Sequence, residues 1–126
     1  MQLMPSTFAQ IQSRNPELQS VDHPESNIAA GIYHARSLWR LWTGSVAPED
    51  RTTFMFGSYN AGRVPILRAQ DLAAARAFDP ARWARVEAVS PDVPRWRHRE
   101  TLRYVRRIDA NLARLDERGR VVRRAR

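Results

Sequence analysis

The chain has 126 residues, which is enough for one compact domain with a hydrophobic core of its own. Its 43% hydrophobic and 27% charged residues are typical of a globular protein and argue against intrinsic disorder. The chain has no cysteine, so a disulfide framework and a thiolate metal site are excluded. No run of about 18 apolar residues is present, so the sequence predicts no membrane-spanning segment.

The net charge of +8 comes entirely from arginine, because all 21 basic residues are arginine and none is lysine. Such uniformity is typical of a biased nucleotide composition, which weakens the inference from charge to a nucleic-acid partner. The attraction to polyanions is nevertheless real. An anionic envelope surface is therefore a permissible partner.

Proline, glycine and capping residues divide the chain into about six helices. The expected helices begin at Pro5, at Asn27 with Ser26 or Asn27 as the cap, at Pro48, at Pro65, after Asp79-Pro80, and at about His98. Their expected ends lie near Asn15, at Gly44, at Gly62, near Phe78 and before Pro91, and the basic tail after Gly119 is expected to be loose. No stretch alternates long enough to form a strand, so the sequence predicts an all-α fold.

Two helices show a clear apolar stripe at steps of three and four residues. The first stripe is Ile28, Ile32, Ala35, Trp39 and Trp42, and the second is Leu102, Val105, Ile108, Leu112 and Leu115. This spacing places each set on one helix face, which we expect to be buried. Trp39 and Trp42 are accordingly assigned to the core.

Three short segments place polar groups beside glycine, proline or aromatic residues where packing alone does not require them. They are residues 1–7, the Tyr59-Asn60-Ala61-Gly62 sequence, and Glu100-Thr101 with Tyr104. Each has a simple structural explanation when it is taken alone, as a helix start, a helix end and a first helical turn. Their order along the chain carries more information than any one of them.

In that order the segments resemble the lysozyme-like domain of lytic murein transglycosylases, of the soluble type and the related membrane-bound F type. Family members carry Gly-Leu-Met-Gln-[Leu/Ile]-Met-Pro-x-Thr, then Asn-Ile followed by a small residue and Gly, then Ala-Tyr-Asn-Ala-Gly, and finally Glu-Thr-x-x-Tyr-Val. The counterparts here are residues 1–7, 27–33, 58–62 and 100–105. Residues 79–83, Asp-Pro-Ala-Arg-Trp, look more like the F type. The resemblance covers residues 1–113 as one domain and leaves residues 114–126 as a basic C-terminal tail.

The resemblance implies an all-α, lysozyme-like fold and cleavage of the β-1,4 bond between N-acetylmuramic acid and N-acetylglucosamine. The muramoyl 6-hydroxyl attacks its own anomeric carbon and leaves a 1,6-anhydromuramoyl end. One glutamate acts first as the acid and then as the base, which requires a raised pKa. In the family this glutamate belongs to a Glu-Ser motif before the Met-Gln segment. We therefore expect the acid and its helix upstream of Met1, no catalytic residue within the chain, and no turnover by this chain alone.

Six residues on the matched motifs are candidates for substrate binding by resemblance: Gln2, Met4, Tyr59, Asn60, Glu100 and Tyr104. The amide of Gln2 suits an acetamido group or a hydroxyl, and Met4 offers soft apolar contact to a sugar face. Tyr59 can hydrogen-bond near the departing oxygen. Glu100 and Tyr104 lie one helical turn apart, so both can reach across a groove. No metal and no cofactor are implied.

The remaining aromatic residues and histidines are weaker candidates. Trp96 follows Pro94 among arginines, so it is the tryptophan that we expect to face a ligand. His34 and His98 lack the spacing of metal ligands and are expected on the surface.

The resemblance places the protein in the cell envelope or periplasm with peptidoglycan strands as its partner, although residues 1–7 lack the features of a signal peptide. No nucleic-acid partner is expected. Two alternatives stay open: a catalytically inactive glycan-binding protein, and a basic α-helical module that grips nucleic acid with residues 95–126. A strong loss of binding with added salt, and no preference for chitin-like oligosaccharides, would favour the nucleic-acid module.

Overall fold

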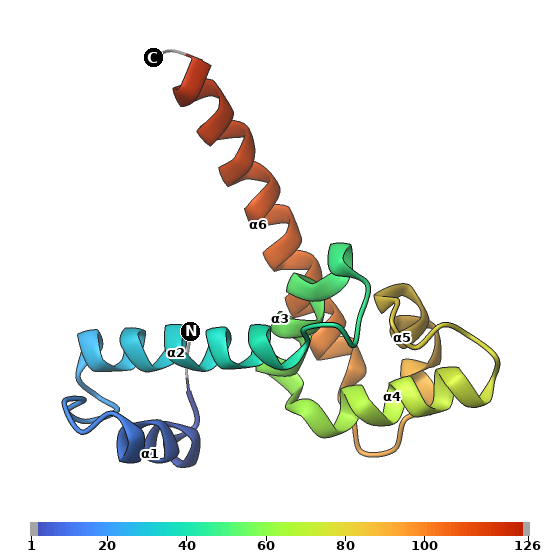
Figure 1. Ribbon diagram of the computed structural model, residues 1–126, viewed down its shortest axis with the longest axis horizontal. Coiled ribbons are helices and arrows are strands. Elements are labelled where there is room, and N and C mark those ends of the chain that lie inside the picture. Colours follow the sequence, from blue (N-terminus) through green and yellow to red (C-terminus); the bar gives the residue numbers. More distant parts are fainter. Residues whose placement is uncertain (1–2, 125–126) are drawn as a thin grey trace. The chain divides into compact units, whose positions relative to one another are not determined.

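The computed structural model describes the backbone of residues 3–124 and the side chains of residues 3–115. Within these residues the chain forms six α-helices and two short 3-10 helices, η1 and η2, and no strand, so the all-α prediction is confirmed (Figure 1). The helices are α1 (Pro5–Arg14), α2 (Pro24–Leu41), η1 (Pro48–Asp50), α3 (Arg51–Ala61), α4 (Arg63–Ala75), α5 (Trp83–Val89), η2 (Ser90–Asp92) and α6 (His98–Arg124). They form two compact units, residues 1–41 and residues 42–126.

The first unit is a pair of helices, α1 and α2, that lie alongside one another (Figure 1). The predicted start of α2 at Ser26 or Asn27 is wrong, because α2 begins at Pro24. The ring nitrogen Nδ1 of His23 accepts a hydrogen bond from the backbone amide of Ser26, at 3.2 Å. His23 therefore satisfies one of the free amides of the first turn, and Pro24 occupies a position that needs no donor.

The buried face of α2 is not the one that its large apolar residues predict. Ile28 and Ile32 are 61% and 58% exposed, whereas Ala30 and Gly31 are buried. Small side chains let a neighbouring helix approach closely, so helix packing favours this face over the isoleucine stripe. The predicted stripe is correct for Trp42, which is 2% exposed and lies in the core of the second unit, while Trp39 is only half-buried.

The core of the second unit is built around three aromatic rings, which come from α3, from α5 and from the segment after α2. Phe54 is fully buried, with its ring 5.1 Å from that of Trp42 and 5.2 Å from that of Trp83, the second contact being edge to face. Such tilted and edge-to-face contacts add to the stabilisation that burial of the rings provides. The carboxylate of Asp50 accepts a hydrogen bond from the backbone amide of Trp83, at 2.9 Å, which joins η1 to the start of α5.

Four helix boundaries in the second unit differ from those predicted. The helix expected from Pro48 opens as η1, and α3 begins at Arg51. Helix α4 begins at Arg63, so Pro65 is its third residue, and it ends at Ala75 before the positive φ of Ala77. Asp79 accepts a hydrogen bond from the amide of Ala81 in a turn, and α5 begins only at Trp83.

The two glycines that were predicted to end helices both have a positive φ, which favours glycine and interrupts a helix. Gly62 follows directly on Ala61, the last residue of α3, so that prediction is confirmed. Helix α2 ends at Leu41, and a turn separates it from Gly44, so the predicted last residue, Thr43, is two residues too late.

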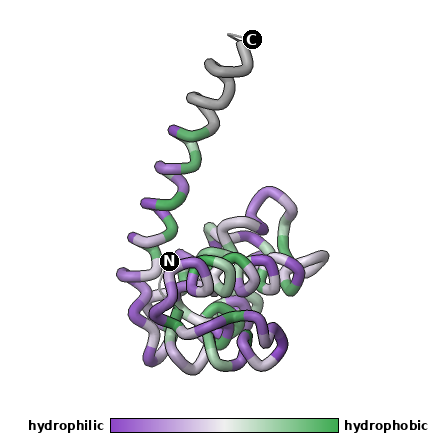
Figure 2. Tube along the Cα trace, turned by 90° about the vertical axis from the view of Figure 1, so that its left-hand side faces the viewer, coloured by the Kyte–Doolittle hydropathy of each residue, from purple (hydrophilic) through white to green (hydrophobic). Residues whose placement is uncertain are grey.

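Helix α6 is long and continues past the region where a loose tail was expected. Its backbone is helical through Gly119 to Arg124, so that expectation is wrong. Val105 is buried in the core, but Leu112 and Leu115 on the same stripe are 42% and 62% exposed. Apolar and polar residues alternate along this projecting part of the helix (Figure 2). The apolar stripe of α6 therefore continues beyond the part of the helix that packs against the core.

Candidate functional site

The last turn of α3, the loop before α6 and the first turns of α6 meet in the second unit. The side chain of Thr101 joins all three segments: its hydroxyl donates to Oδ1 of Asn60, at 2.9 Å, and accepts from the indole Nε1 of Trp96, at 3.0 Å. Thr101 is only 2% exposed, so its hydroxyl is shielded from water. The structure thus brings together two motifs that lie 41 residues apart in the sequence.

A cavity of about 260 Å³ opens beside this network. Its wall includes Asn60 from α3, Arg95 and Trp96 from the loop, and Glu100 from α6. Asn60 and Glu100 are exposed, so their amide and carboxylate groups are accessible to a ligand. We call these residues together with Thr101 the α3–α6 cleft.

Two tyrosines lie near the cleft on the same helices. Tyr59 precedes Asn60 on α3, and Tyr104 lies one turn after Glu100 on α6. Burial raises the pKa of Tyr59 above its usual range, and the neighbouring Tyr104 raises it further. Burial also raises the pKa of Tyr104. Both phenols therefore remain neutral hydrogen-bonding groups at physiological pH.

Tyr59 and Asn60 are fixed by the packing of the residue before them. Ser58 is 2% exposed, and its hydroxyl accepts a hydrogen bond from the indole Nε1 of Trp42, at 3.0 Å. Because Ser58 faces the core, Asn60, two residues later on α3, points to another side of the helix and is exposed. Gly62, with a φ of 81°, then turns the chain into α4.

The remaining two candidate residues, Gln2 and Met4, come from the start of the chain. Met4 belongs to the first unit, where it is 69% exposed and its carbonyl oxygen accepts from the amide of Phe8 at the start of α1. Gln2 lies outside the described residues. Four of the six candidates, Tyr59, Asn60, Glu100 and Tyr104, lie on α3 and α6, and two of these, Asn60 and Glu100, line the cleft.

Two expectations about aromatic and histidine residues need correction. Trp96 is not an exposed stacking platform: it is 8% exposed and packs in the core, and it contributes only part of its surface to the cleft. The indole of Trp96 is held inward because Thr101 accepts its N–H and leaves that donor satisfied away from water. His34 is half-buried, and this burial lowers its pKa.

The sequence reasoning missed Thr101 as the central residue of the site and Arg95 and Arg97 as parts of its wall. Thr101 stood within a matched motif, but its buried position could not be inferred from spacing. Arg95 has a φ of 62°, a conformation that residues other than glycine seldom adopt. Its place after Pro94 was the available signal of a tight turn.

Two negative findings bound the chemistry of the described residues. No group of three or more acidic or histidine side chains among them is placed to hold a metal ion. No helix in the described part of the chain is long and apolar enough to cross a membrane.

The described helices form an all-α domain with a polar cleft between α3 and α6. A family model described as the transglycosylase SLT domain matches residues 1–81 of the 126, so the chain belongs to that family. No curated protein and no solved structure matches the chain. Family membership implies a peptidoglycan substrate and transglycosylase activity in general. The matched range includes Tyr59 and Asn60 and ends before Glu100 and Tyr104.

Proposed function

We propose that the chain is the glycan-binding part of a peptidoglycan lytic transglycosylase of the cell envelope, and that it holds the strand in the cleft between α3 and α6. The reaction would cleave the bond between N-acetylmuramic acid and N-acetylglucosamine and leave 1,6-anhydromuramoyl ends. The observation that carries the proposal is the buried hydrogen-bond chain from Trp96 through Thr101 to Asn60. This chain fixes the amide of Asn60 beside the carboxylate of Glu100 at one opening.

The chemistry of this opening suits a sugar. With Oδ1 of Asn60 engaged by Thr101, its NH₂ group is directed to donate to a carbonyl or hydroxyl oxygen of a ligand. Glu100 accepts hydrogen bonds from sugar hydroxyls or an amide N–H. The hydroxyl oxygen of Tyr59 is buried, and neither Tyr59 nor Tyr104 lines the opening, so the donors at the opening do not include a phenol. An acetamido sugar presents complementary groups of each kind.

The reaction needs an acid to protonate the leaving oxygen. Among the carboxyl groups of the described residues, that of Asp109 has a raised pKa, because burial and the nearby charge of Glu87 both disfavour its ionised form. However, Asp109 lies nine residues after Glu100 on α6, about two and a half turns, and so faces the opposite side of the helix. Asp109 therefore cannot act on a bond held in the α3–α6 cleft.

The test is digestion of purified peptidoglycan by this chain and by the product of the same gene extended upstream through the next Glu-Ser. Mass spectrometry of the released sugar ends identifies the reaction. We expect 1,6-anhydromuropeptides from the extended form alone, and their loss when its Glu-Ser glutamate is replaced by Gln. Release by neither form, together with retained glycan binding, would instead support the inactive glycan-binding alternative.

A further inference from the structure

Helix α6 continues beyond the core of the second unit, and its outer part carries an apolar stripe with exposed leucines. The stripe is formed by Ile108, Leu112 and Leu115, at steps of four and three residues. Leu112 and Leu115 are 42% and 62% exposed and Ile108 is half-buried, whereas Val105, three residues earlier, lies in the core. Figure 2 shows apolar and polar residues in turn along this stretch. The outer turns of α6 therefore present large apolar side chains to the surroundings.

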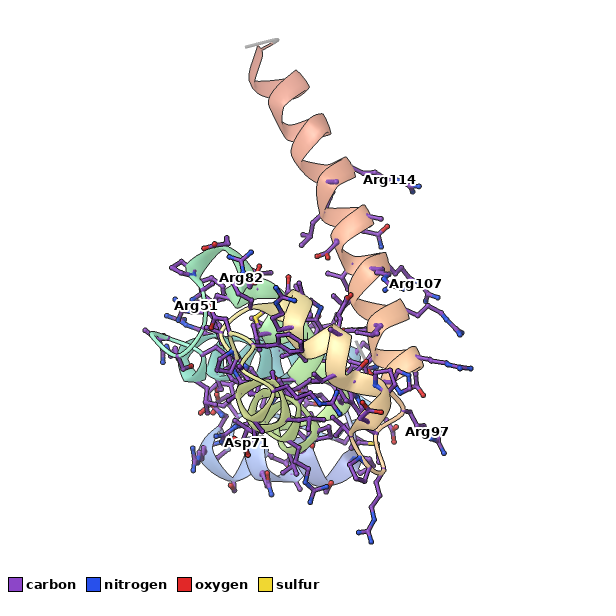
Figure 3. All side chains as sticks on the ribbon, turned by 90° about the vertical axis from the view of Figure 1, so that its right-hand side faces the viewer. Arg51, Asp71, Arg82, Arg97, Arg107 and Arg114 are labelled. Atoms are coloured by element: carbon purple, nitrogen blue, oxygen red, sulfur yellow. The ribbon has the colours of Figure 1, made fainter. Side chains whose placement is uncertain are left out.

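Exposed arginines follow one flank of this stripe. Arg107 and Arg114 each directly precede a stripe residue, so each lies about 100° around the helix from it. They are about two turns apart and extend from the same side of α6 (Figure 3). Within residues 3–115 neither arginine forms an ion pair with a carboxylate. The long stem of an arginine can lie along an apolar surface while its guanidinium group reaches a polar layer beside it.

The carboxylates near this part of α6 lie on another side of the helix. Arg106 forms an ion pair with Glu87 of α5, at 3.5 Å, and the charge of Glu87 also acts on Asp109. Helix geometry places Asp109 roughly 140° or more around α6 from Arg107 and from Arg114. The flank that carries Arg107 and Arg114 therefore remains strongly positive.

Most of the net charge of the chain also falls at this end of the sequence. Residues 98–126 contain ten arginines and four acidic residues, while the whole chain has a net charge of +8. A helix with an apolar stripe, an arginine-rich polar face and a low overall hydrophobicity is typical of helices that lie flat in the interface of a bilayer. Anionic headgroups attract the arginines, and the boundary with the acyl chains accepts the leucines.

We propose that the outer part of α6, residues 107–115, docks on the surface of an anionic lipid bilayer. Leu112 and Leu115 enter the boundary between headgroups and acyl chains, and Arg107 and Arg114 bind the headgroup phosphates. This surface is separate from the α3–α6 cleft, to which α6 contributes residues of its first turn. The docking holds the protein at a membrane whatever ligand the cleft binds.

Two other occupants fit the surface less well. Coiled-coil pairing with a second copy needs apolar heptads sustained over about three to four repeats, whereas the stripe from Ile108 to Leu115 covers about one. A second α6 would also bring the same excess of arginine alongside the first, and like charges repel. Nucleic acid would account for the arginines but gives the exposed leucines no role.

The test measures sedimentation of the full chain with vesicles of two compositions. One is phosphatidylcholine alone, and the other contains about one third phosphatidylglycerol. We expect binding to the anionic vesicles to be at least about tenfold tighter than to the neutral ones, and to weaken with added salt. Arg107→Gln combined with Arg114→Gln should weaken binding to the anionic vesicles about thirtyfold. Leu112→Gln combined with Leu115→Gln should weaken it about tenfold.

Matched controls come from α4, which also has exposed arginines and exposed apolar residues. They are Arg63→Gln combined with Arg68→Gln, and Val64→Gln combined with Leu67→Gln. Each control changes the net charge or the apolar surface in the same way as its α6 counterpart, and we expect neither to reduce binding by more than about twofold. Glutamine is a good helix former, and circular dichroism checks that every variant keeps its helices.

Four outcomes would overturn the inference, and none of them bears on glycan binding by the cleft. The first is sedimentation with neither kind of vesicle or equally with both, and the second is an equal loss from the α4 controls. The third is a loss from the arginine variant alone together with tight binding of single-stranded DNA, which would make α6 a general polyanion-binding helix. The fourth is a dimer in analytical ultracentrifugation that the leucine variant dissociates, which would make a second copy the occupant of the stripe.

Discussion

The indole ring of Trp83 lies directly against the backbone of Gly57. A Cβ atom placed on Gly57 would lie 2.5 Å from Cη2 and 2.9 Å from Cζ3 of that ring, closer than real side-chain contacts allow. The ring cannot withdraw easily, because it also packs edge to face on Phe54 and donates through Nε1 to Glu87, at 3.0 Å. The absence of a side chain at residue 57 is thus what lets α5 approach α3.

Replacing Gly57 by alanine should therefore destabilise the protein. The clash and the shift of Trp83 are expected to lower the free energy of unfolding by about 1–3 kcal/mol, even though alanine is the better helix former. Chemical denaturation followed by circular dichroism measures this. The double variant with Trp83→Leu should show a smaller loss from Gly57→Ala than the native background does. A neutral or stabilising effect of Gly57→Ala would show that the ring is not fixed there.

Within the α3–α6 cleft, substitution of Thr101 is expected to have the largest effect on stability and on ligand binding. Thr101→Val keeps the shape of the side chain but leaves the N–H of Trp96 and the amide oxygen of Asn60 without their partner. We expect a loss of about 1–3 kcal/mol in unfolding free energy and weaker glycan binding. Thr101→Ser retains the hydroxyl and serves as the matched control. Equal behaviour of the two variants would show that the hydrogen-bond chain contributes to neither property.

Much of the helical layout could be predicted from the sequence, because proline, glycine and helix periodicity act locally. All six helices begin within three residues of the predicted start, although α5 begins only after the Asp79-Pro80 turn. The face that α2 buries could not be predicted, because Ala30 and Gly31 are chosen by what packs on them and not by their own hydrophobicity. Ile28 and Ile32 offered the stronger signal and are exposed.

The candidate site could be predicted in part for a similar reason. Motif order correctly grouped Asn60 with Glu100, but it gave no indication that Thr101 would be buried between them. The cavity lined by Arg97, Arg99 and Arg103 could not be predicted either. The whole sequence is rich in arginine, so charge alone did not distinguish Arg97 from Arg114. Only the three-dimensional arrangement shows which arginines gather around one opening.

The two tyrosines near the cleft predict a loss of stability in alkali. Their pKa values are raised by burial, so the folded state favours the protonated phenols. This contribution is fully present below the unfolded tyrosine pKa of about 10 and disappears as pH rises through the higher folded values. Phenolate absorbance of the native protein should therefore rise at higher pH than that of the urea-unfolded protein. Tyr59→Phe and Tyr104→Phe should each remove part of the late rise, and coincident native and unfolded curves would contradict the prediction.

The raised pKa of Asp109 predicts that the unfolding free energy depends on pH in the acid range. Its pKa is raised by burial and by the charge of Glu87, so the folded state favours the protonated carboxyl and is penalised when it ionises. The favourable contribution is present below the unfolded pKa and is lost as pH rises through the folded value. Asp109→Asn should thus increase the unfolding free energy at neutral pH, by less than about 1 kcal/mol because the residue is largely exposed.

Denaturation of Asp109→Asn and of the native protein at several pH values measures this effect. The difference between the two should vanish once Asp109 is protonated in both states. Asp92→Asn is the matched control, because Asp92 forms an exposed ion pair with Arg76, at 2.8 Å, and its removal should lower stability slightly at neutral pH. If Asp109→Asn lowers stability at neutral pH as Asp92→Asn does, Asp109 is held by a favourable interaction and its proximity to Glu87 does not govern its charge.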